Sequence, residues 1–335
     1  MRSSHIKFVL FALASVAAAF PQGGVLGAIG EFVGKKPIPP SDDPFYLPPQ
    51  GFESAKPGQI LNSRPVPGGV ALLNLVPLQL KGSWQLLYRT SDAQGKPTVT
   101  VTTVLVPFNA DPKKVINYQV AEDSGGEINC APSYAIQNQA ALKDPGTANI
   151  EAALIAAALN QGWIVNSPDW EGPKSTFVAG FQAGYATLDS IRAALASESI
   201  TGVSPQAKVQ MWGYSGGALA SEWASELQVK YYPEAPIIGM AIGGVTPNVT
   251  NVFNRINKGP FAGIAAAGFL GLGNAYPEFG SFVQQSLKPK TAAAINQAGK
   301  QCFYADVVGF AGQDIFKYFK QGKGIFDGML ILSLT

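Results

Sequence analysis

Residues 208–230 read KVQMWGYSGGALASEWASELQVK. The segment from Lys208 to Gly213 predicts a β-strand, and the segment from Gly217 to Lys230, rich in Ala, Leu and Glu, predicts a helix. Between them lies the pattern G-x-S-x-G with Ser215 at its centre. A serine on a tight turn between a strand and a helix is the arrangement of a nucleophilic serine. A glycine turn with a purely structural role is the alternative.

The chemistry of such a serine depends on the backbone groups around it. The glycines of the motif let chain segments approach closely, so that the Ser215 hydroxyl projects above the sheet and the Gly216 N–H can stabilise an oxyanion. A second N–H donor would come from the loop after the strand predicted at residues 115–120, where Asp123 is the candidate. Taken alone, such a loop is more often just a polar turn.

The pattern outward from this stretch predicts the fold class. Two β-branched and aromatic runs around Asp92 to Pro97 predict a hairpin, and strands then alternate with helices. The predicted strands are residues 84–89, 98–107, 115–120, 163–167, 208–213 and 237–242, and the predicted helices are residues 148–160, 176–196 and 217–230. In the first helix, Ile150, Leu154, Ile155 and Leu159 are expected on one side. We therefore expect an α/β fold, a mostly parallel sheet with helices on both faces.

The chain divides into five segments. Residues 1–19 have the basic start, apolar run and small-residue end of a secretory signal peptide, too short for a membrane anchor. Residues 20–75 are rich in Pro and Gly and predict an arm wrapped around the core at 76–249. Residues 250–325 contain an apolar, glycine-rich stretch at 264–272 and expected helices at 291–300 and 313–320. They predict a helical cap, or equally a set of core-covering helices. An apolar tail follows at 326–335.

Composition limits the kinds of partner. Net charge is only +2 and no run of Lys or Arg stands out, which argues against a nucleic-acid partner. Cys130 and Cys302 predict one disulfide in a secreted protein, worth about 5 kcal/mol in the chain-entropy model, with two buried thiols as the alternative. Asn248 begins a glycosylation sequon that is usable only on the surface. No spacing suggests a metal site, and no cofactor is expected.

Several short pieces resemble the fungal secretory lipases, the lipase-A-like group of Candida-type yeasts. They are Asp43-Pro44-Phe45-Tyr46, Gly58-Gln59-Ile60-Leu61, Ala121-Glu122-Asp123-Ser124, Cys130-Ala131-Pro132-Ser133-Tyr134, Pro168-Asp169-Trp170-Glu171-Gly172 and Gly213-Tyr214-Ser215-Gly216-Gly217. The resemblance implies an α/β-hydrolase core with a helical cap, a lipid interface, and hydrolysis of triacylglycerols and other esters. It also implies Ser215 as nucleophile, Asp123 and Gly216 as the oxyanion hole, and a disulfide between Cys130 and Cys302.

One feature departs from this pattern, because His5, inside the expected signal peptide, is the sole histidine. A serine nucleophile needs a base, and in this fold the acid and histidine follow the serine. The late acids Asp306, Asp314 and Asp327 are each predicted to be solvated. We expect a C-terminally truncated chain that lacks the last strands, leaves residues 237–242 as an exposed sheet edge, and is nearly inactive. A non-catalytic lipid-binding relative, and an acyltransferase or peptide hydrolase of the same fold, are the alternatives.

Overall fold

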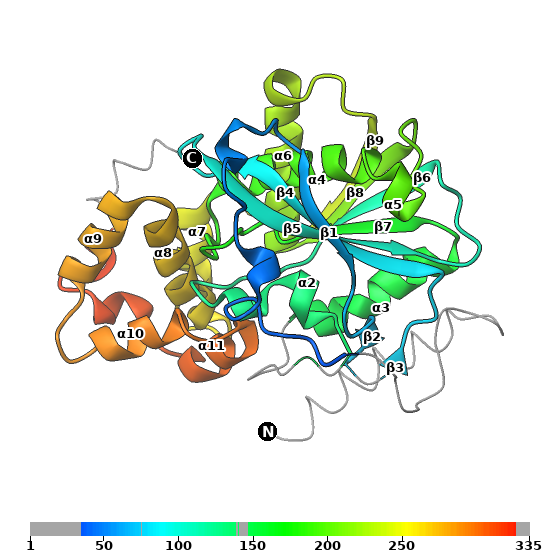
Figure 1. Ribbon diagram of the computed structural model, residues 1–335. Helices are drawn as coiled ribbons and strands as arrows, with labels where there is room; N and C mark the ends of the chain where they lie inside the picture. Colours follow the sequence, from blue (N-terminus) through cyan, green and yellow to red (C-terminus); the bar gives the residue numbers. More distant parts are fainter. Residues whose placement is uncertain (1–34, 75, 139, 141–146, 326–335) are drawn as a thin grey trace.

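The computed structural model describes residues 35–74, 76–138, 140 and 147–325, apart from the side chains of residues 147–150 (Figure 1). The expected signal peptide, Asp327 and the tail lie outside these residues. Within them, a seven-stranded sheet has the order β1-β4-β5-β7-β6-β8-β9. Its strands are β1 (Ile60–Pro65), β4 (Gly82–Ser91), β5 (Pro97–Val106), β6 (Lys114–Gln119), β7 (Ile164–Pro168), β8 (Lys208–Tyr214) and β9 (Ile237–Gly243). A separate two-stranded ribbon joins β2 (Ala71–Leu72) to β3 (Val76–Pro77).

Strand direction divides the sheet into two parts. The strands β6, β7, β8 and β9 are parallel, whereas β1, β4 and β5 pair antiparallel with one another and β5 pairs antiparallel with β7. Because β4 opposes β5, it points the same way as the four parallel strands, and only β1 and β5 run against them. The predicted hairpin is β4 and β5, and every predicted strand is present.

Helices cover both faces of the sheet, as expected. They are α2 (Pro132–Ala135), α3 (Thr147–Asn160), α4 (Gly180–Leu195), α5 (Glu198–Thr201) and α6 (Gly216–Tyr231). Successive residues of β6 point to opposite faces: Val115 joins the buried cluster formed with α4 and α6, and Ile116 joins the cluster formed with α3. Both faces of β6 and β7 are therefore buried, whereas β8 and β9, toward the edge of the sheet, carry exposed residues.

Two helix predictions were wrong in detail. Ile155 and Leu159 of α3 are buried, but Leu154 is 41% exposed, because it lies one residue, about 100°, around the helix from Ile155. The helix predicted from Thr176 begins only at Gly180, since the preceding residues form a turn in which Val178 has a φ of 59°.

The two edges of the sheet differ in origin. The arm provides one of them, because β1 pairs with β4. At the other, β9 ends the described sheet, and its Ile238 and Met240 are 60% and 41% exposed. The prediction of an exposed edge at residues 237–242 is confirmed for this part of the chain.

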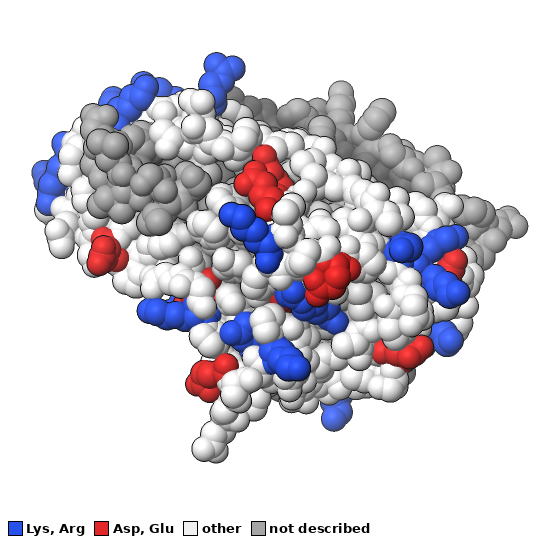
Figure 2. All heavy atoms as spheres, turned by 90° about the horizontal axis from the view of Figure 1, so that it is seen from above, with Lys and Arg blue, Asp and Glu red and all other residues white. Residues whose placement is uncertain are grey.

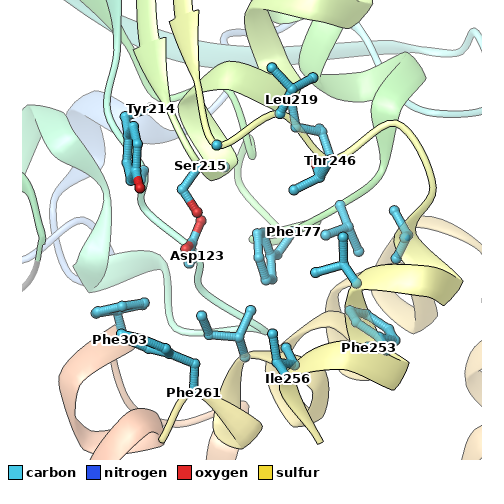
Figure 3. A pocket seen from close by; sticks show the side chains of 18 of the residues that line it. Asp123, Phe177, Tyr214, Ser215, Leu219, Thr246, Phe253, Ile256, Phe261 and Phe303 are labelled. Atoms are coloured by element: carbon cyan, nitrogen blue, oxygen red, sulfur yellow. The ribbon is translucent and has the colours of Figure 1, made fainter. Parts of the chain in front are cut away.

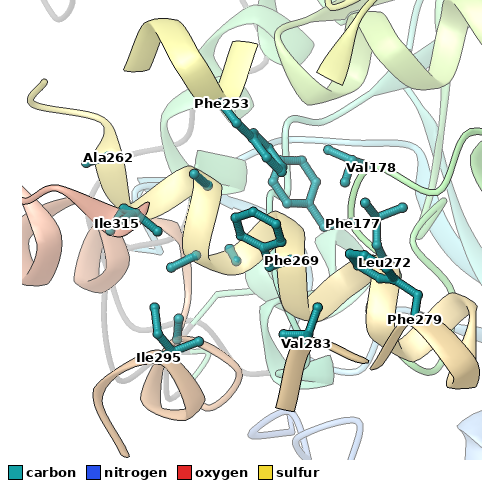
Figure 4. Close-up of a cluster of buried hydrophobic side chains, with 14 of the residues drawn as sticks. Phe177, Val178, Phe253, Ala262, Phe269, Leu272, Phe279, Val283, Ile295 and Ile315 are labelled. Carbon is teal, nitrogen blue, oxygen red and sulfur yellow. The ribbon is translucent and has the colours of Figure 1, made fainter. Parts of the chain in front are cut away.

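Residues after β9 form a group of helices beside the sheet (Figure 1). It contains α7 (Val249–Ile256), α8 (Ala262–Ala275), α9 (Pro277–Ser286), α10 (Ala292–Ala298) and α11 (Phe303–Phe310). Helix α8 is central: Phe269 packs against Phe253 and Phe319, and Figure 4 shows the buried side chains gathered around it. The helix predicted at residues 313–320 is only a single 3-10 turn at Ile315–Tyr318.

The surface charge and the length of the helices indicate which kinds of partner the protein could bind. On the face seen in Figure 2, Lys and Arg lie among Asp and Glu across the middle of the molecule. Within the described ranges, no helix is long and apolar enough to cross a membrane. The expected absence of a nucleic-acid partner is a prediction that these observations do not test.

Candidate active site

Ser215 occupies the turn between β8 and α6, where it has a φ of 53° and a ψ of −117°. Two glycines make this strained turn possible. A Cβ at Gly213 would lie 2.2 Å from the Gly217 carbonyl oxygen, and one at Gly217 would lie 1.9 Å from the Gln119 carbonyl oxygen of β6. The turn is therefore pressed against its own helix and against the neighbouring strand. This is the tight strand-to-helix turn that the motif predicts for a nucleophilic serine.

The N-terminus of α6 lies directly after the serine. Ser215 N–H donates to the Gly243 carbonyl oxygen at 2.9 Å, which ties the turn to the end of β9. Gly216 is the first residue of a 16-residue helix, where backbone N–H groups have no intrahelical acceptor and the helix dipole is positive. This end of α6 therefore suits a developing negative charge.

Asp123 approaches Ser215 from the loop after β6. It has a φ of 52° and is 2% exposed, and its Oδ1 has no hydrogen-bond partner within the described residues. A Cβ at Gly216 would lie 2.0 Å from this oxygen, so the carboxyl group rests against the residue that follows the nucleophile. In Figure 3 the carboxyl group points toward the Ser215 hydroxyl. Burial raises the pKa of Asp123 to about 7.

The Asp123 N–H has a different neighbour. The Glu171 carboxyl group, on the loop after β7, accepts hydrogen bonds from the backbone N–H groups of Asp123 and Ser124, the latter at 3.2 Å. The sequence predicts this N–H of Asp123 as an oxyanion donor. In the structure it faces Glu171, and it is the side chain of Asp123 that faces the serine.

Further carboxyl groups are buried around these loops. Asp169 accepts the Ser133 N–H at 2.8 Å and the Ser133 hydroxyl, and Glu151 accepts the Tyr118 hydroxyl at 3.0 Å. Burial raises the pKa of Asp169 to about 7 and that of Glu151 to about 8. Burial and neighbouring carboxyl groups raise the pKa values of Glu122 and Glu171 well above their ordinary range. Sequence reasoning missed this cluster, although its signal was visible: acidic pairs follow two strands predicted in succession.

A mostly apolar cavity of about 440 Å³ opens at the serine (Figure 3). Its polar part includes Ser215, Gly216 and Asp123, together with Glu151 and Thr246. The apolar walls come from α6, α7, α8, α11 and the adjoining loops, among them Phe177, Leu219, Val249, Phe253, Ile256, Phe261, Ile264 and Phe303. The structure thus brings the predicted nucleophile and both predicted oxyanion residues to one cavity beside the helical group.

The remaining predicted residues lie nearby. Cys130 and Cys302 form a disulfide between the loop that follows Asp123 and the start of α11, which confirms the pairing and excludes two free thiols. Asn248 is exposed, and its side chain caps α7 by accepting the Asn251 N–H at 2.8 Å. The sequon therefore lies on the surface, next to the cavity-lining Val249.

The late acids give a mixed result. Asp306 is only 1% exposed and accepts a hydrogen bond from the Gln301 side chain at 2.7 Å, so the prediction of a solvated residue was wrong. Asp314 pairs with Lys258 at 3.3 Å. Neither residue lines the cavity at Ser215. Within the described ranges there is no group of three or more His, Cys, Asp or Glu residues arranged to hold a metal ion.

Known proteins with this architecture define its class. The chain matches Candida antarctica lipase A in its closed state with a TM-score of 0.78 and 34% identity, over 89% of this chain and 68% of that one. A hydrolase from Legionella pneumophila, with a TM-score of 0.62 but 17% identity, supports the fold alone. The chain therefore has the α/β-hydrolase fold.

Sequence relatives narrow the class to a family. The chain is 47% identical to Lipase A of Arthroderma benhamiae over 298 residues, and 45% identical to Lipase 4 of Candida albicans over 305 residues. These matches cover 87% and 89% of this chain, and the family model "Secretory lipase" matches residues 137–334. The chain belongs to the secretory lipase family. It spans 63% and 65% of the lengths of these two relatives.

Proposed function

We propose that this chain carries the nucleophile and acyl pocket of a secreted triacylglycerol lipase or carboxylic ester hydrolase. The observation that carries the proposal is the position of Ser215, on a strained strand-to-helix turn that opens into an apolar cavity of about 440 Å³. Membership of the secretory lipase family supports both the substrate class and export from the cell. The exposed Asn248 is then a site for glycosylation in the secretory pathway.

The proposed reaction proceeds through an acyl-enzyme. Ser215 Oγ attacks the ester carbonyl carbon, and the Gly216 N–H at the start of α6 stabilises the resulting oxyanion. Asp123, the second member of the oxyanion hole implied by the family resemblance, contributes its N–H by exchanging Glu171 for the oxyanion. The ester C–O bond then breaks and the alcohol leaves, which gives the acyl-enzyme; water attacks its carbonyl carbon, the bond to Oγ breaks, and the acid and free Ser215 are released. Phe253 and Ile256 of α7 and Ile264 of α8, which line the cavity, provide apolar surface for the acyl chain.

The 335-residue chain is expected to turn over slowly. His5 is the one histidine in these 335 residues, and in this fold the triad histidine follows the serine, so we propose that they do not include that base. Loss of a triad member lowers turnover by about 10⁴- to 10⁶-fold. Robust turnover by this chain, abolished by Ser215→Ala, would contradict this expectation.

Covalent labelling tests the nucleophile separately from turnover. Under prolonged incubation a fluorophosphonate should add one phosphonyl group to the chain, slowly because no histidine of these residues activates the serine; peptide mass spectrometry should locate it on Ser215, and Ser215→Ala should abolish the labelling. Ser225→Ala, a serine further along the same helix, is the matched control and should label normally. Hydrolysis should favour esters over peptides when a series of acyl-chain lengths is compared. An unlabelled chain that binds fatty acid would instead indicate a lipid-binding relative, and cleavage of peptides alone would indicate a different hydrolase.

A further inference from the structure

We infer that a basic pocket of the helical group is a docking surface for a phospholipid surface that carries anionic phosphate head groups. This pocket is lined by Asn254, Asn257, Lys258, Asp314, Lys317 and Lys323, among others. The inference deepens the proposed function, on which it rests for the role of the neighbouring acyl cavity. The family resemblance implies a lipid interface, but it identifies neither the part of the molecule that touches the lipid nor the charge of that lipid.

Positive charge is concentrated in the helical group. Residues 250–325 contain eight Lys or Arg and three Asp or Glu, a balance of +5, whereas the whole sequence has a net charge of only +2. The rest of the sequence therefore carries −3. Because the helical group lies beside the sheet, the two charges are separated in space (Figure 1). Such an asymmetry turns the basic end of a protein toward a negatively charged surface.

The basic pocket gathers part of this charge. Its volume is about 340 Å³, and the exposed side chains of Lys258, Lys317 and Lys323 lie around it. The hydrogen bond from Asn257 and the neighbouring Lys258 hold the pKa of Asp314 below its ordinary value, so this carboxylate stays charged and offsets one lysine. Among the described residues, Lys317 and Lys323 have no ion-pair partner. The pocket therefore keeps a net positive charge, which suits a phosphate group.

Two further lysines lie beside the pocket. Lys288, which follows α9, donates from its Nζ to the Lys317 carbonyl oxygen at 2.8 Å, and Lys320 is exposed in the same segment as Lys317. Segments that are about 30 residues apart in sequence thus form one basic surface with five lysines. Clusters of about four to eight Lys or Arg at a membrane-facing surface are typical of binding to anionic lipids.

Helix α7 separates the basic pocket from the acyl cavity at Ser215. Its Ile256 lines the acyl cavity, whereas Asn254 and Asn257, on another face of the helix, line the basic pocket. Phe261, only three residues after Lys258, lines the acyl cavity and is 49% exposed. A lipid surface held by the lysines therefore lies next to the acyl cavity, where Phe261 offers it an apolar contact.

A second basic cavity, at the other end of the sheet, provides a comparison within the same molecule. Lys113, Lys114 and Lys208 line this cavity of about 490 Å³, and Asp111 pairs with Lys114 at 3.2 Å. It has the same balance of charge as the basic pocket. It lies where β6 and β8 begin, whereas Ser215 follows the end of β8, so a strand length of about 20 Å separates them. Its lysines are not expected to touch a lipid surface that faces the acyl cavity.

Co-sedimentation of the 335-residue protein with vesicles tests the inference. Vesicles of phosphatidylcholine alone are compared with vesicles that contain about 30% phosphatidylglycerol, in about 0.1 M salt, and the protein should bind the anionic vesicles more tightly. The double variant Lys317→Gln/Lys323→Gln should bind them about 25-fold more weakly, since each lysine at an anionic surface contributes about fivefold. The matched control Lys113→Gln/Lys208→Gln removes the same charge and should weaken binding less than about twofold.

The other outcomes overturn the docking surface in distinguishable ways. Equal weakening in both variants would show a response to net charge alone, and equal binding to the two kinds of vesicle would show that head-group charge has no role. Release of the protein by about 10 mM inorganic phosphate at constant ionic strength would indicate a site for a free anion. Circular dichroism checks that both variants fold, and the comparison of the two vesicles needs no substitution.

Fluorophosphonate labelling of the same samples separates this inference from the proposed function. A chain that binds anionic vesicles through Lys317 and Lys323 but is not labelled at Ser215 keeps the docking surface and overturns the proposed nucleophile. A chain that is labelled at Ser215 but does not prefer anionic vesicles keeps the nucleophile and overturns the docking surface.

Discussion

The two loops that meet at the cavity are held in place by different physical means. The turn at Ser215 is fixed by close backbone approach: Gly217 lies against the Gln119 carbonyl oxygen and Gly213 against Gly217 itself. The loop at Asp123 is fixed by a buried carboxyl group, because Glu171 accepts its backbone N–H groups. Steric fit does not change with pH, whereas a carboxyl group titrates. Of the two loops that border the cavity, the stability of the Ser215 turn should therefore not depend on pH, whereas the stability of the Asp123 loop should.

Gly217→Ala should have the largest effect, because the new Cβ would lie 1.9 Å from a backbone oxygen that cannot move without shifting β6. We expect the free energy of unfolding to fall by more than about 4 kcal/mol, or the protein not to fold. Urea unfolding followed by circular dichroism measures this, and the loss should be the same at acidic and neutral pH. Gly239→Ala in β9, where a Cβ meets nothing within 4 Å, is the control. A wild-type-like Gly217→Ala would mean that the turn is not sterically fixed.

Raising the pH should have the next largest effect on the free energy of unfolding, through the buried carboxyl groups on the loops after β6 and β7. The pKa values of Glu122 and Glu171 are raised in the folded protein, so both keep their protons there while the unfolded chain releases them above about pH 4. Their stabilising contribution is complete below that pH and is lost as pH rises toward their folded pKa values. In the pH range between its unfolded and folded pKa values, each such group lowers the free energy of unfolding by about 1.4 kcal/mol per pH unit. The unfolding free energy should therefore fall steadily between about pH 5 and pH 7, and a flat profile would contradict the buried cluster.

Glu171→Gln should have the smallest effect on the free energy of unfolding. It tests directly whether the pH dependence of the Asp123 loop comes from Glu171. The amide oxygen of Gln can still accept the N–H groups of the Asp123 loop, but the side chain cannot ionise in the unfolded chain. The variant should be within about 1 kcal/mol of wild type at about pH 5, and its unfolding free energy should then rise relative to that of wild type as the pH increases, because the raised pKa of Glu171 destabilises only the wild type. Glu53→Gln, at an exposed position, is the matched control and should follow the wild-type profile. The same slope in Glu171→Gln as in wild type would exclude Glu171 as the titrating group.

The sheet could be predicted because alternation and β-branched runs are local signals. The strand β1 could not, because its residues Asn62, Ser63 and Arg64 are polar and its place is decided by pairing with β4 at the edge. The short helices α7, α9 and α11 were also missed, since packing around α8 stabilises them more than their own sequence does. The 3-10 turn at Ile315–Tyr318 shows the converse, a helix-like composition without a helix.

The residues of the candidate site that belong to a sequence motif could be predicted. Those whose role depends on burial could not. Ser215 and Gly216 follow from spacing alone, whereas the direction of the Asp123 side chain depends on how β6 and β7 lie side by side. Acidic residues are usually solvated, so composition alone placed Asp306 on the surface, and the same expectation hid Glu122 and Glu171. Glu122 and Glu171 are buried because two loops that are distant in sequence pack against each other, which the sequence alone does not indicate.

The disulfide has a consequence for how a bulky molecule reaches the nucleophile. Cys130 follows the Asp123 loop and Cys302 precedes the cavity-lining Phe303, so this side of the cavity is covalently tethered and cannot swing outward. Residues 244–256, which also line the cavity, are connected to the rest of the described chain only through the backbone and by non-covalent contacts. A displacement of α7 would therefore widen the cavity without any change at the disulfide, whereas a displacement of the start of α11 would pull on it.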